Sequence, residues 1–295
     1  MVPTFISTAD EKYTDVLKVS IRQALKLYPD SSFYVYDWGL KKESKASILS
    51  ISKNVRVISW ELQMVDLPVK FSGWIFYKRL FQLHSLRTVL SNLFKKRTLL
   101  FPEKIYQWIT FEMKIYNKFL CIEHFNDTYK TKFIFLDADA FIINKFDGLF
   151  DGSFDVGVTV RPKQEWSFTY NNCTILNVGV IFFLGEHTAN TQLITAWHNE
   201  LKVIQEINCE QTALTRLLHR CKTDIFTDTQ SVQTITVGAE PVRIRVLRCE
   251  DYNFNWIEEF DVDKHRHRVK ILHLKSGRFE TPLFKKIATK LNITT

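Results

Sequence analysis

Glycine and proline are scarce in this chain of 295 residues, where 9 Gly and 7 Pro stand against 24 Phe and 7 Trp. A composition that is poor in chain-breaking residues and rich in bulky apolar ones excludes a disordered chain or long flexible linkers. Because 45% of the residues are hydrophobic, a chain of this length can bury a sizeable core. We therefore expect one compact globular unit.

Cysteine is also rare, with five residues that form neither a CxxC pair nor a spacing typical of zinc ligands. This excludes a zinc-ribbon or zinc-finger module. Widely spread cysteines in odd number favour free or buried thiols in a reducing compartment over a set of disulfides. They are Cys121, Cys173, Cys209, Cys221 and Cys249.

Long apolar runs are absent, since no uninterrupted stretch approaches the roughly 18 residues that span a bilayer. The first residues, Met-Val-Pro-Thr-Phe-Ile-Ser-Thr, lack a basic segment followed by an apolar one, so we expect no signal peptide. These features predict a soluble, cytoplasmic protein.

Charge is unevenly placed, with a formal net charge of +8 and a concentration of Lys and Arg among aromatic residues at 70–104. The net charge favours an acidic partner, which includes a nucleic acid, an anionic membrane or a phosphorylated small molecule. The stretch at 70–104 is typical of a helix that makes peripheral contact with an anionic membrane or an acceptor. A helix with one core face and one solvated basic face explains it as well, and we favour that interpretation.

Hydrophobic periodicity alternates between strand and helix along the chain. This predicts an α/β fold with a mostly parallel, mixed, doubly wound sheet that is flanked by helices. The expected helices lie at 14–27, 44–51, 106–122, 191–205 and 210–219. The expected strands lie at 4–8, 32–36, 55–58, 132–136, 156–160, 178–183, 242–247 and 270–274.

Two acids, Asp137 and Asp139, follow the apolar strand at 132–136 and are separated only by the small Ala138. Apolar residues flank the pair on both sides, so we expect the acids to lie in an extended, strand-like run. In extended backbone, residues two apart point to the same side, which lets both carboxylates reach one hard cation, or one cation and a ribose. Acids at the carboxyl end of such a strand also lie where α/β sheets bind ligands.

Asp137-Ala138-Asp139 resembles the Asp-x-Asp signature of glycosyltransferases with the GT-A fold, a Rossmann-like nucleotide-binding fold. Later segments are similar to those of the glycogenin and lipopolysaccharide galactosyltransferase group, in the same order along the chain. They are Asn177-Val178-Gly179-Val180, Glu210-Gln211, the segment from Leu247 to Asn253, and His273 with Gly277. Glu210 stands where that group has Asp. The resemblance implies a single GT-A domain over 1–295, with a nucleotide-binding half at 1–143 and an acceptor- and sugar-binding half at 144–295.

The resemblance and the residue chemistry together indicate a cation site. Two aspartates with a neutral imidazole from His273 can hold Mn²⁺ or Mg²⁺ against a diphosphate. Lys275 and Arg278, on either side of Gly277, can donate to the same phosphates.

Further positions are candidates for the donor nucleotide-sugar and its chemistry. Thr8, Asp10 and Asp37 follow the first two strands, where a nucleotide is expected, although Asp10 is equally well a helix cap. Asn177 beside Gly179 offers an amide and a backbone that a sugar can approach. The resemblance assigns catalysis to Glu210, as base or acceptor-orienting group, and to Gln211, as a stabiliser of a cationic transition state.

These observations predict a metal-dependent glycosyltransferase that moves a hexose or pentose from a nucleotide-diphosphate sugar to a glycan or another hydroxyl acceptor. The resemblance favours a UDP-sugar, and retention over inversion. Two other classes stay open: a nucleic-acid-binding module, which the charge permits although no recognised motif supports it, and another Asp-pair enzyme such as a nucleotidyltransferase or phosphohydrolase. The sequence does not indicate an oligomeric state.

Overall fold

The computed structural model describes residues 1–63, 103–166, 168–169, 172–173, 175–203, 209–221, 231–274 and 278–293. The expectation of a basic helix at 70–104 lies outside these residues, except that its last two positions begin a long helix.

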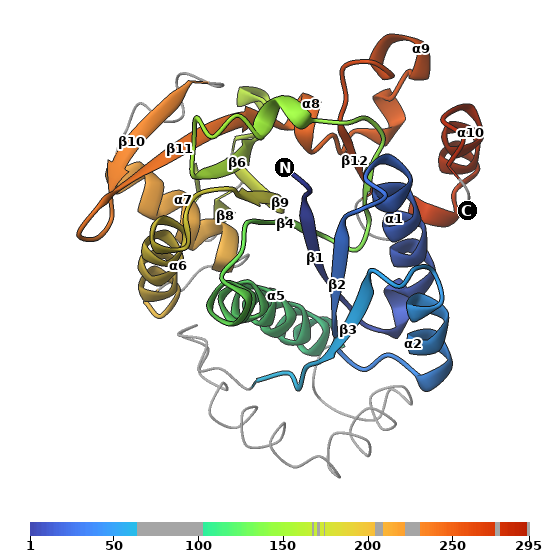
Figure 1. Cartoon of the computed structure of the whole chain (residues 1–295), viewed down its shortest axis with the longest axis horizontal. Coiled ribbons are helices and arrows are strands. Elements are labelled where there is room, and N and C mark those ends of the chain that lie inside the picture. Colours follow the sequence, from blue (N-terminus) through green and yellow to red (C-terminus); the bar gives the residue numbers. More distant parts are fainter. Residues whose placement is uncertain are drawn as a thin grey trace.

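The chain opens with the expected β-α-β alternation, and the predicted elements are confirmed (Figure 1). Strands β1 (Thr4–Ala9), β2 (Ser32–Asp37) and β3 (Val55–Ser59) pair in parallel. Between them lie α1 (Thr14–Leu27) and α2 (Lys42–Leu49). Helix α1 buries an apolar face at helical spacing, and the chain leaves it at Tyr28, directly before Pro29.

Eight strands form one sheet in the order β10-β11-β6-β9-β4-β1-β2-β3. The additional strands are β4 (Phe133–Leu136), β6 (Val156–Val160), β9 (Leu176–Phe183), β10 (Val232–Thr236) and β11 (Pro241–Arg248). Strand β9 runs antiparallel to both of its neighbours, and β10 is an antiparallel edge strand. The sheet is therefore mixed and mostly parallel, as predicted.

Helices cover both faces of this sheet. On one side lie α5 (Glu103–Tyr129), α6 (His187–Leu201) and α7 (Cys209–Cys221), whose apolar side chains form one core with the sheet. On the other side α1 and α2 bury a second core, around Phe5, Phe33 and Phe182. Strand β4 and the part of β9 at 178–183 are buried, continuous apolar runs, which is the pattern of a sheet covered on both sides.

A small second sheet lies beside α1 and carries the C-terminal part of the chain. In it β5 (Ala140–Ile142) pairs antiparallel with β12 (Ile271–His273). The short helices α9 (Val262–His265) and α10 (Pro282–Lys290) contribute to a third apolar core here, and another short helix, α8 (Cys249–Tyr252), follows β11. This sheet connects the end of the chain to the segment that follows β4.

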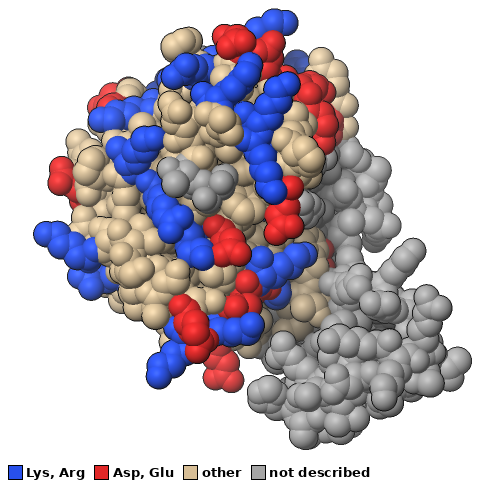
Figure 2. Space-filling view, turned by 90° about the vertical axis from the view of Figure 1, so that its right-hand side faces the viewer, with Lys and Arg blue, Asp and Glu red and all other residues tan. Residues whose placement is uncertain are grey.

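The surface over α1, α2 and α10 carries Asp and Glu side chains among its Lys and Arg side chains (Figure 2). The four cysteines whose side chains the structure describes are free, as expected. Across the described part of the chain, every helix is either too short or too polar for a membrane span.

Candidate active site

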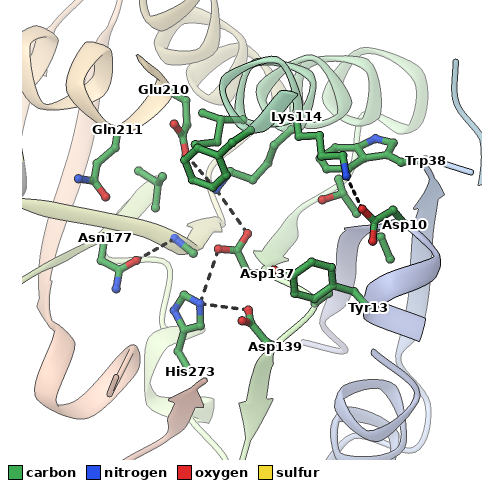
Figure 3. Close-up of a pocket in the computed structure, with 18 of the residues that line it drawn as sticks. Asp10, Tyr13, Trp38, Lys114, Asp137, Asp139, Asn177, Glu210, Gln211 and His273 are labelled. Atoms are coloured by element: carbon green, nitrogen blue, oxygen red, sulfur yellow. Dashed lines mark hydrogen bonds and ion pairs between the residues drawn. The ribbon is translucent and has the colours of Figure 1, made fainter. Parts of the chain in front are cut away.

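The Asp137-Ala138-Asp139 segment is a turn, and the expectation of an extended, strand-like run was wrong. The Ala140 N–H donates to the Asp137 carbonyl at 2.9 Å and closes the turn. The physical reason is that β4 belongs to the large sheet and β5 to the small one, so the backbone changes direction between them. Both carboxylates nevertheless face the same cavity (Figure 3).

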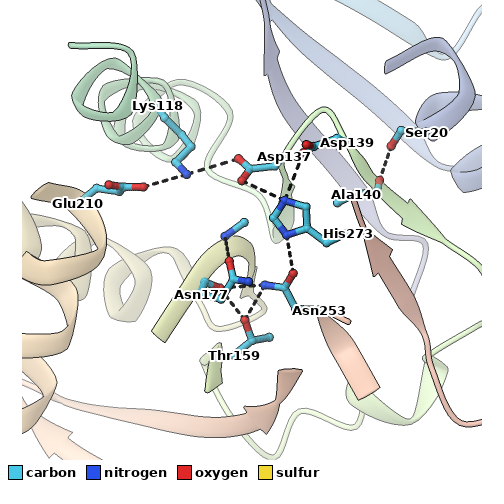
Figure 4. A network of polar contacts seen from close by, with 11 residues as sticks. Ser20, Lys118, Asp137, Asp139, Ala140, Thr159, Asn177, Glu210, Asn253 and His273 are labelled. Carbon is cyan, nitrogen blue, oxygen red and sulfur yellow. Dashed lines mark hydrogen bonds and ion pairs between the residues drawn. The ribbon is translucent and has the colours of Figure 1, made fainter. Parts of the chain in front are cut away.

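The turn and the end of β12 bring three metal-ligating side chains together. His273 Nε2 lies 3.2 Å from an Asp139 carboxylate oxygen and 3.7 Å from one of Asp137 (Figure 4). The ligand atoms of the three residues all lie within 4.8 Å of one another. His273 and Asp139 are buried, so the donors converge in a site of reduced solvent access. Two carboxylates and one imidazole fit a divalent cation such as Mn²⁺.

Gly179 makes this convergence sterically feasible. A Cβ built on Gly179 would overlap His273 Cε1, and it would lie 2.8 Å from both His273 Nδ1 and Asp137 Oδ2. The Gly179 carbonyl also accepts the Asp137 N–H at 2.8 Å. From the sequence we expected a sugar to approach the backbone of Gly179. In the structure the side chains of His273 and Asp137, two of the proposed metal ligands, lie against it instead.

Lys118 on α5 lies across the cavity from His273 and was not singled out from the sequence. Its Nζ is 2.9 Å from Glu210 Oε1 and 3.4 Å from Asp137 Oδ1. Burial alone would lower the pKa of Lys118, but the charges of Asp137 and Glu210 raise it above its ordinary value. The ammonium therefore stays charged between the two acids.

Glu210 begins the catalytic pair expected at the start of α7, and it is buried. Burial raises the pKa of Glu210, while the neighbouring Lys118 charge opposes that shift. Glu210 Oε2 and Asn177 Nδ2 are buried and have no hydrogen-bond partner among the described residues. Since buried polar atoms in folded proteins are normally paired, both atoms, on residues that line the cavity, point to a polar ligand. Gln211 lines the same cavity.

The opposite end of the cavity is built from the ends of β1 and β2 and the residues that follow them, and aromatic rings line it. Thr8 and Asp10 lie here, as expected, together with Tyr13 and Trp38. Asp10 caps the short helix Glu11–Tyr13, which was one of its two predicted roles, and it also forms an ion pair with Lys114 in the cavity wall. Its contact with a nucleotide stays a prediction. Burial, and then the charges of Asp139 and Asp10, raise the pKa of the Tyr13 hydroxyl to about 12, so this hydroxyl is protonated at neutral pH.

The whole cavity has a volume of about 440 Å³ and includes Ala138 and Gly179 in its lining. Asp37, contrary to expectation, is not among the lining residues. Its carboxylate accepts the N–H groups of Gly39 and Leu40 at 2.8 and 2.6 Å and pairs with Lys45, so it stabilises the turn after β2.

The positions expected to hold phosphate are described only in part. Lys275 and Gly277 lie outside the described residues, and Arg278 is the first residue of a short 3-10 helix, Arg278–Glu280. Their contact with a diphosphate stays a prediction.

No protein-family model matches the sequence, and no curated protein matches it. Among solved structures, the chain is similar to the WbbM bifunctional glycosyltransferase in its apo form, with 12% identity and a TM-score of 0.52. That alignment covers 98% of this chain and 51% of the other, so the chain spans about half the length of that protein.

Two more structures align over the full length of the chain with lower scores. The galactosyltransferase LgtC, in complex with donor and acceptor sugar analogs, has 12% identity and a TM-score of 0.46 over 99% of this chain and 96% of its own. The apo form of the glycosyltransferase GlyE of Streptococcus pneumoniae TIGR4 has 11% identity and a TM-score of 0.49 over 100% and 61%. The likeness to WbbM, with the mixed sheet described above, confirms the GT-A fold expected from the sequence.

Proposed function

We propose that this protein is a metal-dependent glycosyltransferase that moves a sugar from a nucleotide-diphosphate donor to a hydroxyl of a glycan or another acceptor. The observation that carries the proposal is the meeting of Asp137, Asp139 and His273 at one wall of a cavity. The same cavity holds two buried polar atoms, on Asn177 and Glu210, that have no hydrogen-bond partner in the part of the chain that the structure describes. The GT-A fold shared with a glycosyltransferase supports this assignment.

The carboxylates of Asp137 and Asp139 and the Nε2 atom of His273 would hold the cation. Mn²⁺ is the first candidate for this cation and Mg²⁺ is the second. A bound divalent cation acts as a Lewis acid that neutralises the charge of a leaving nucleoside diphosphate. Lys118 contributes a fixed positive charge beside Asp137, so it can stabilise the same developing negative charge from the protein side.

The sugar end of the cavity lies on the side of Glu210, Gln211 and Asn177. The free amide N–H of Asn177 can donate to a sugar hydroxyl, and Glu210 Oε2 can accept one. Since Lys118 occupies only Oε1, Glu210 keeps one oxygen to orient an acceptor hydroxyl or to receive its proton. Gln211 lies in the same wall, and the resemblance of the motifs assigns its amide the role of stabilising positive charge on the anomeric carbon. We favour retention on the resemblance of the motifs alone.

The nucleoside belongs at the other end, beyond the aspartates, where Tyr13 and Trp38 provide rings for a base to pack against. Thr8, Asp10 and Lys114 supply the polar groups there. UDP is our first candidate for the nucleotide.

The proposal is tested with Asp139→Ala, and with Asp263→Ala as the control because the Asp263 side chain is 86% exposed. Mn²⁺ and UDP together should raise the melting temperature of the wild type and of the control, but not of Asp139→Ala. Donor hydrolysis and sugar transfer should stop in Asp139→Ala and in wild-type protein treated with a chelator. Unchanged activity in both of these samples would refute metal-dependent transfer.

The same melting experiment with UDP-, GDP- and CMP-sugars and with nucleoside triphosphates separates the competing enzyme classes. Stabilisation by a nucleoside diphosphate sugar with Mn²⁺ supports the glycosyltransferase. Stabilisation by nucleoside triphosphates alone would favour a nucleotidyltransferase instead.

A further inference from the structure

The side chain of Asn253, directly after α8, is fully buried behind His273 and touches no solvent. Its Oδ1 lies 2.8 Å from His273 Nδ1. Its Nδ2 donates to Thr159 Oγ1 at 2.8 Å and to the Asn177 carbonyl at 2.9 Å. One amide therefore links β6, β9 and β12 through a single buried network (Figure 4).

The network fixes which end of the Asn253 amide faces the histidine. Thr159 uses its own proton to donate to the Asn177 carbonyl at 2.6 Å, so its Oγ1 faces Asn253 as an acceptor. A reversed amide would place its oxygen against two acceptor oxygens with no proton between them. The NH₂ group must therefore face Thr159 and Asn177, and the oxygen must face His273.

An acceptor at Nδ1 determines the state of the neutral imidazole. The ring carries its proton on Nδ1 and donates it to Asn253, so the lone pair lies on Nε2. Nε2 is the atom that faces the carboxylates of Asp139 and Asp137, at 3.2 and 3.7 Å. In this state the lone pair of Nε2 faces carboxylate oxygens, which also have only lone pairs to offer. A cation between Nε2 and the carboxylates would stabilise this arrangement.

We propose that Asn253 is a positioning residue of the cation site: its buried amide fixes the Nδ1–H tautomer and the orientation of His273, so that Nε2 is a ready metal ligand. This inference rests on the metal-dependent function proposed above. Asn253 also holds the Asn177 backbone, so the amide that lines the sugar end and the imidazole that lines the cation end share one anchor.

A purely structural role for Asn253 makes a different prediction. If the role were purely structural, removing the Asn253 side chain would lower the unfolding free energy without changing the tautomer of His273 or its affinity for metal. The matched control is Asn126→Ala, because Asn126 is equally buried and its Nδ2 also donates to a threonine hydroxyl, but it lies two helical turns beyond Lys118 on α5.

The tautomer is measured directly by long-range ¹H–¹⁵N NMR of metal-free protein with ¹⁵N-labelled histidine, and His273→Ala identifies the signal. We expect Nδ1–H in the wild type and in Asn126→Ala, and loss of this preference in Asn253→Ala. Thr159→Val, which leaves the acceptor at Nδ1 in place, should keep the tautomer.

Calorimetric titration with Mn²⁺ gives the second readout. Removing a group that orients a metal ligand typically weakens binding about 10- to 100-fold, and we expect this for Asn253→Ala, a smaller loss for Thr159→Val, and none for Asn126→Ala. An Nε2–H tautomer in the wild type would overturn the proposal and needs no variant to fold. Equal Mn²⁺ affinity of Asn253→Ala and the wild type would overturn it as well. A wild type that shows Nδ1–H but binds neither Mn²⁺ nor Mg²⁺ would instead refute the metal-dependent function.

Discussion

Gly179→Ala places one methyl group at the most crowded point of the proposed cation site. The backbone at Gly179 is not in the left-handed region, so the backbone conformation itself admits alanine. The obstacle is the neighbouring side chains, because the new Cβ would overlap the His273 ring and lie 2.8 Å from Asp137 Oδ2.

The size of the effect follows from these contacts. Carbon atoms in ordinary contact are about 3.5–4.0 Å apart, so the imidazole must retreat by roughly 1 Å. The ring cannot retreat freely, since Asn253 holds its Nδ1 and the His273 N–H donates to the Phe254 carbonyl at 2.7 Å. Overpacking of a buried site costs about 1–3 kcal/mol of unfolding free energy. A displacement of about 1 Å in a catalytic group can cost roughly 100-fold in rate.

Two glycines serve as controls for the change in stability alone. A Cβ at Gly157 would meet Phe154, Leu247 and Phe182 at 3.1–3.2 Å, in the core and away from the cavity, whereas a Cβ at Gly148 meets nothing within 4 Å. In urea unfolding, the unfolding free energy should fall for Gly179→Ala and Gly157→Ala and change little for Gly148→Ala. Mn²⁺ affinity and the rate of sugar transfer should fall for Gly179→Ala only. Wild-type Mn²⁺ affinity in folded Gly179→Ala would refute the placement of His273 and Asp137 against Gly179.

Two further predictions concern charge. Lys118→Met should lower the unfolding free energy by about 3–5 kcal/mol because it leaves Glu210 buried without its counterion, and Lys118→Met/Glu210→Gln should recover most of that loss in urea unfolding. Asp155 directly precedes β6. Burial alone would raise the pKa of Asp155, but hydrogen bonds from Arg243 and the charge of Arg243 lower it. A lowered pKa in the folded state stabilises the protein above the unfolded value of about 3.9, and this contribution is lost as the pH falls through the folded value. Arg243→Met should therefore cost about 1.5–3 kcal/mol at pH 7 and flatten the loss of stability in acid, as measured by unfolding across pH 2–7.

Much of the architecture could be predicted because its signals are local. Helix α1 buries a face at regular spacing and ends before a proline, so its bounds were predicted from the sequence without error. Strand β9 is buried along its whole length, and its part at 178–183 is a continuous apolar run in the sequence. The antiparallel edge strand β10 was missed, because most of its residues are polar or exposed and no apolar run marks it. The turn at Asp137 to Asp139 was missed because apolar residues on both sides look like one strand, although they belong to two sheets.

The site shows the same division between local and long-range signals. Asp137 and Asp139 are marked by their position after an apolar strand, and His273 was found through the motif that contains it. Lys118 lies in the middle of a long helix, where nothing in the spacing of residues shows that its ammonium reaches one acid in the turn after β4 and another on α7. Asp37 has the same strand-end position as Asp137, but its carboxylate satisfies the N–H groups of its own turn. Local position alone therefore does not distinguish an acid that lines the cavity from one that stabilises a turn.

The pairing of β12 with β5 has a consequence for how the protein is made. The last strand of the large sheet along the chain, β11, ends at Arg248. His273 comes later, at the end of β12, and directly after it the Leu274 N–H donates to the Asp139 carbonyl at 2.8 Å. During synthesis, all eight strands of the large sheet thus leave the ribosome before His273, the proposed third ligand of the cation. High-affinity binding of a cation would then indicate that β12 has paired with β5. A chain that ends after β11 would keep both aspartates but lack His273, and it would bind the cation more weakly.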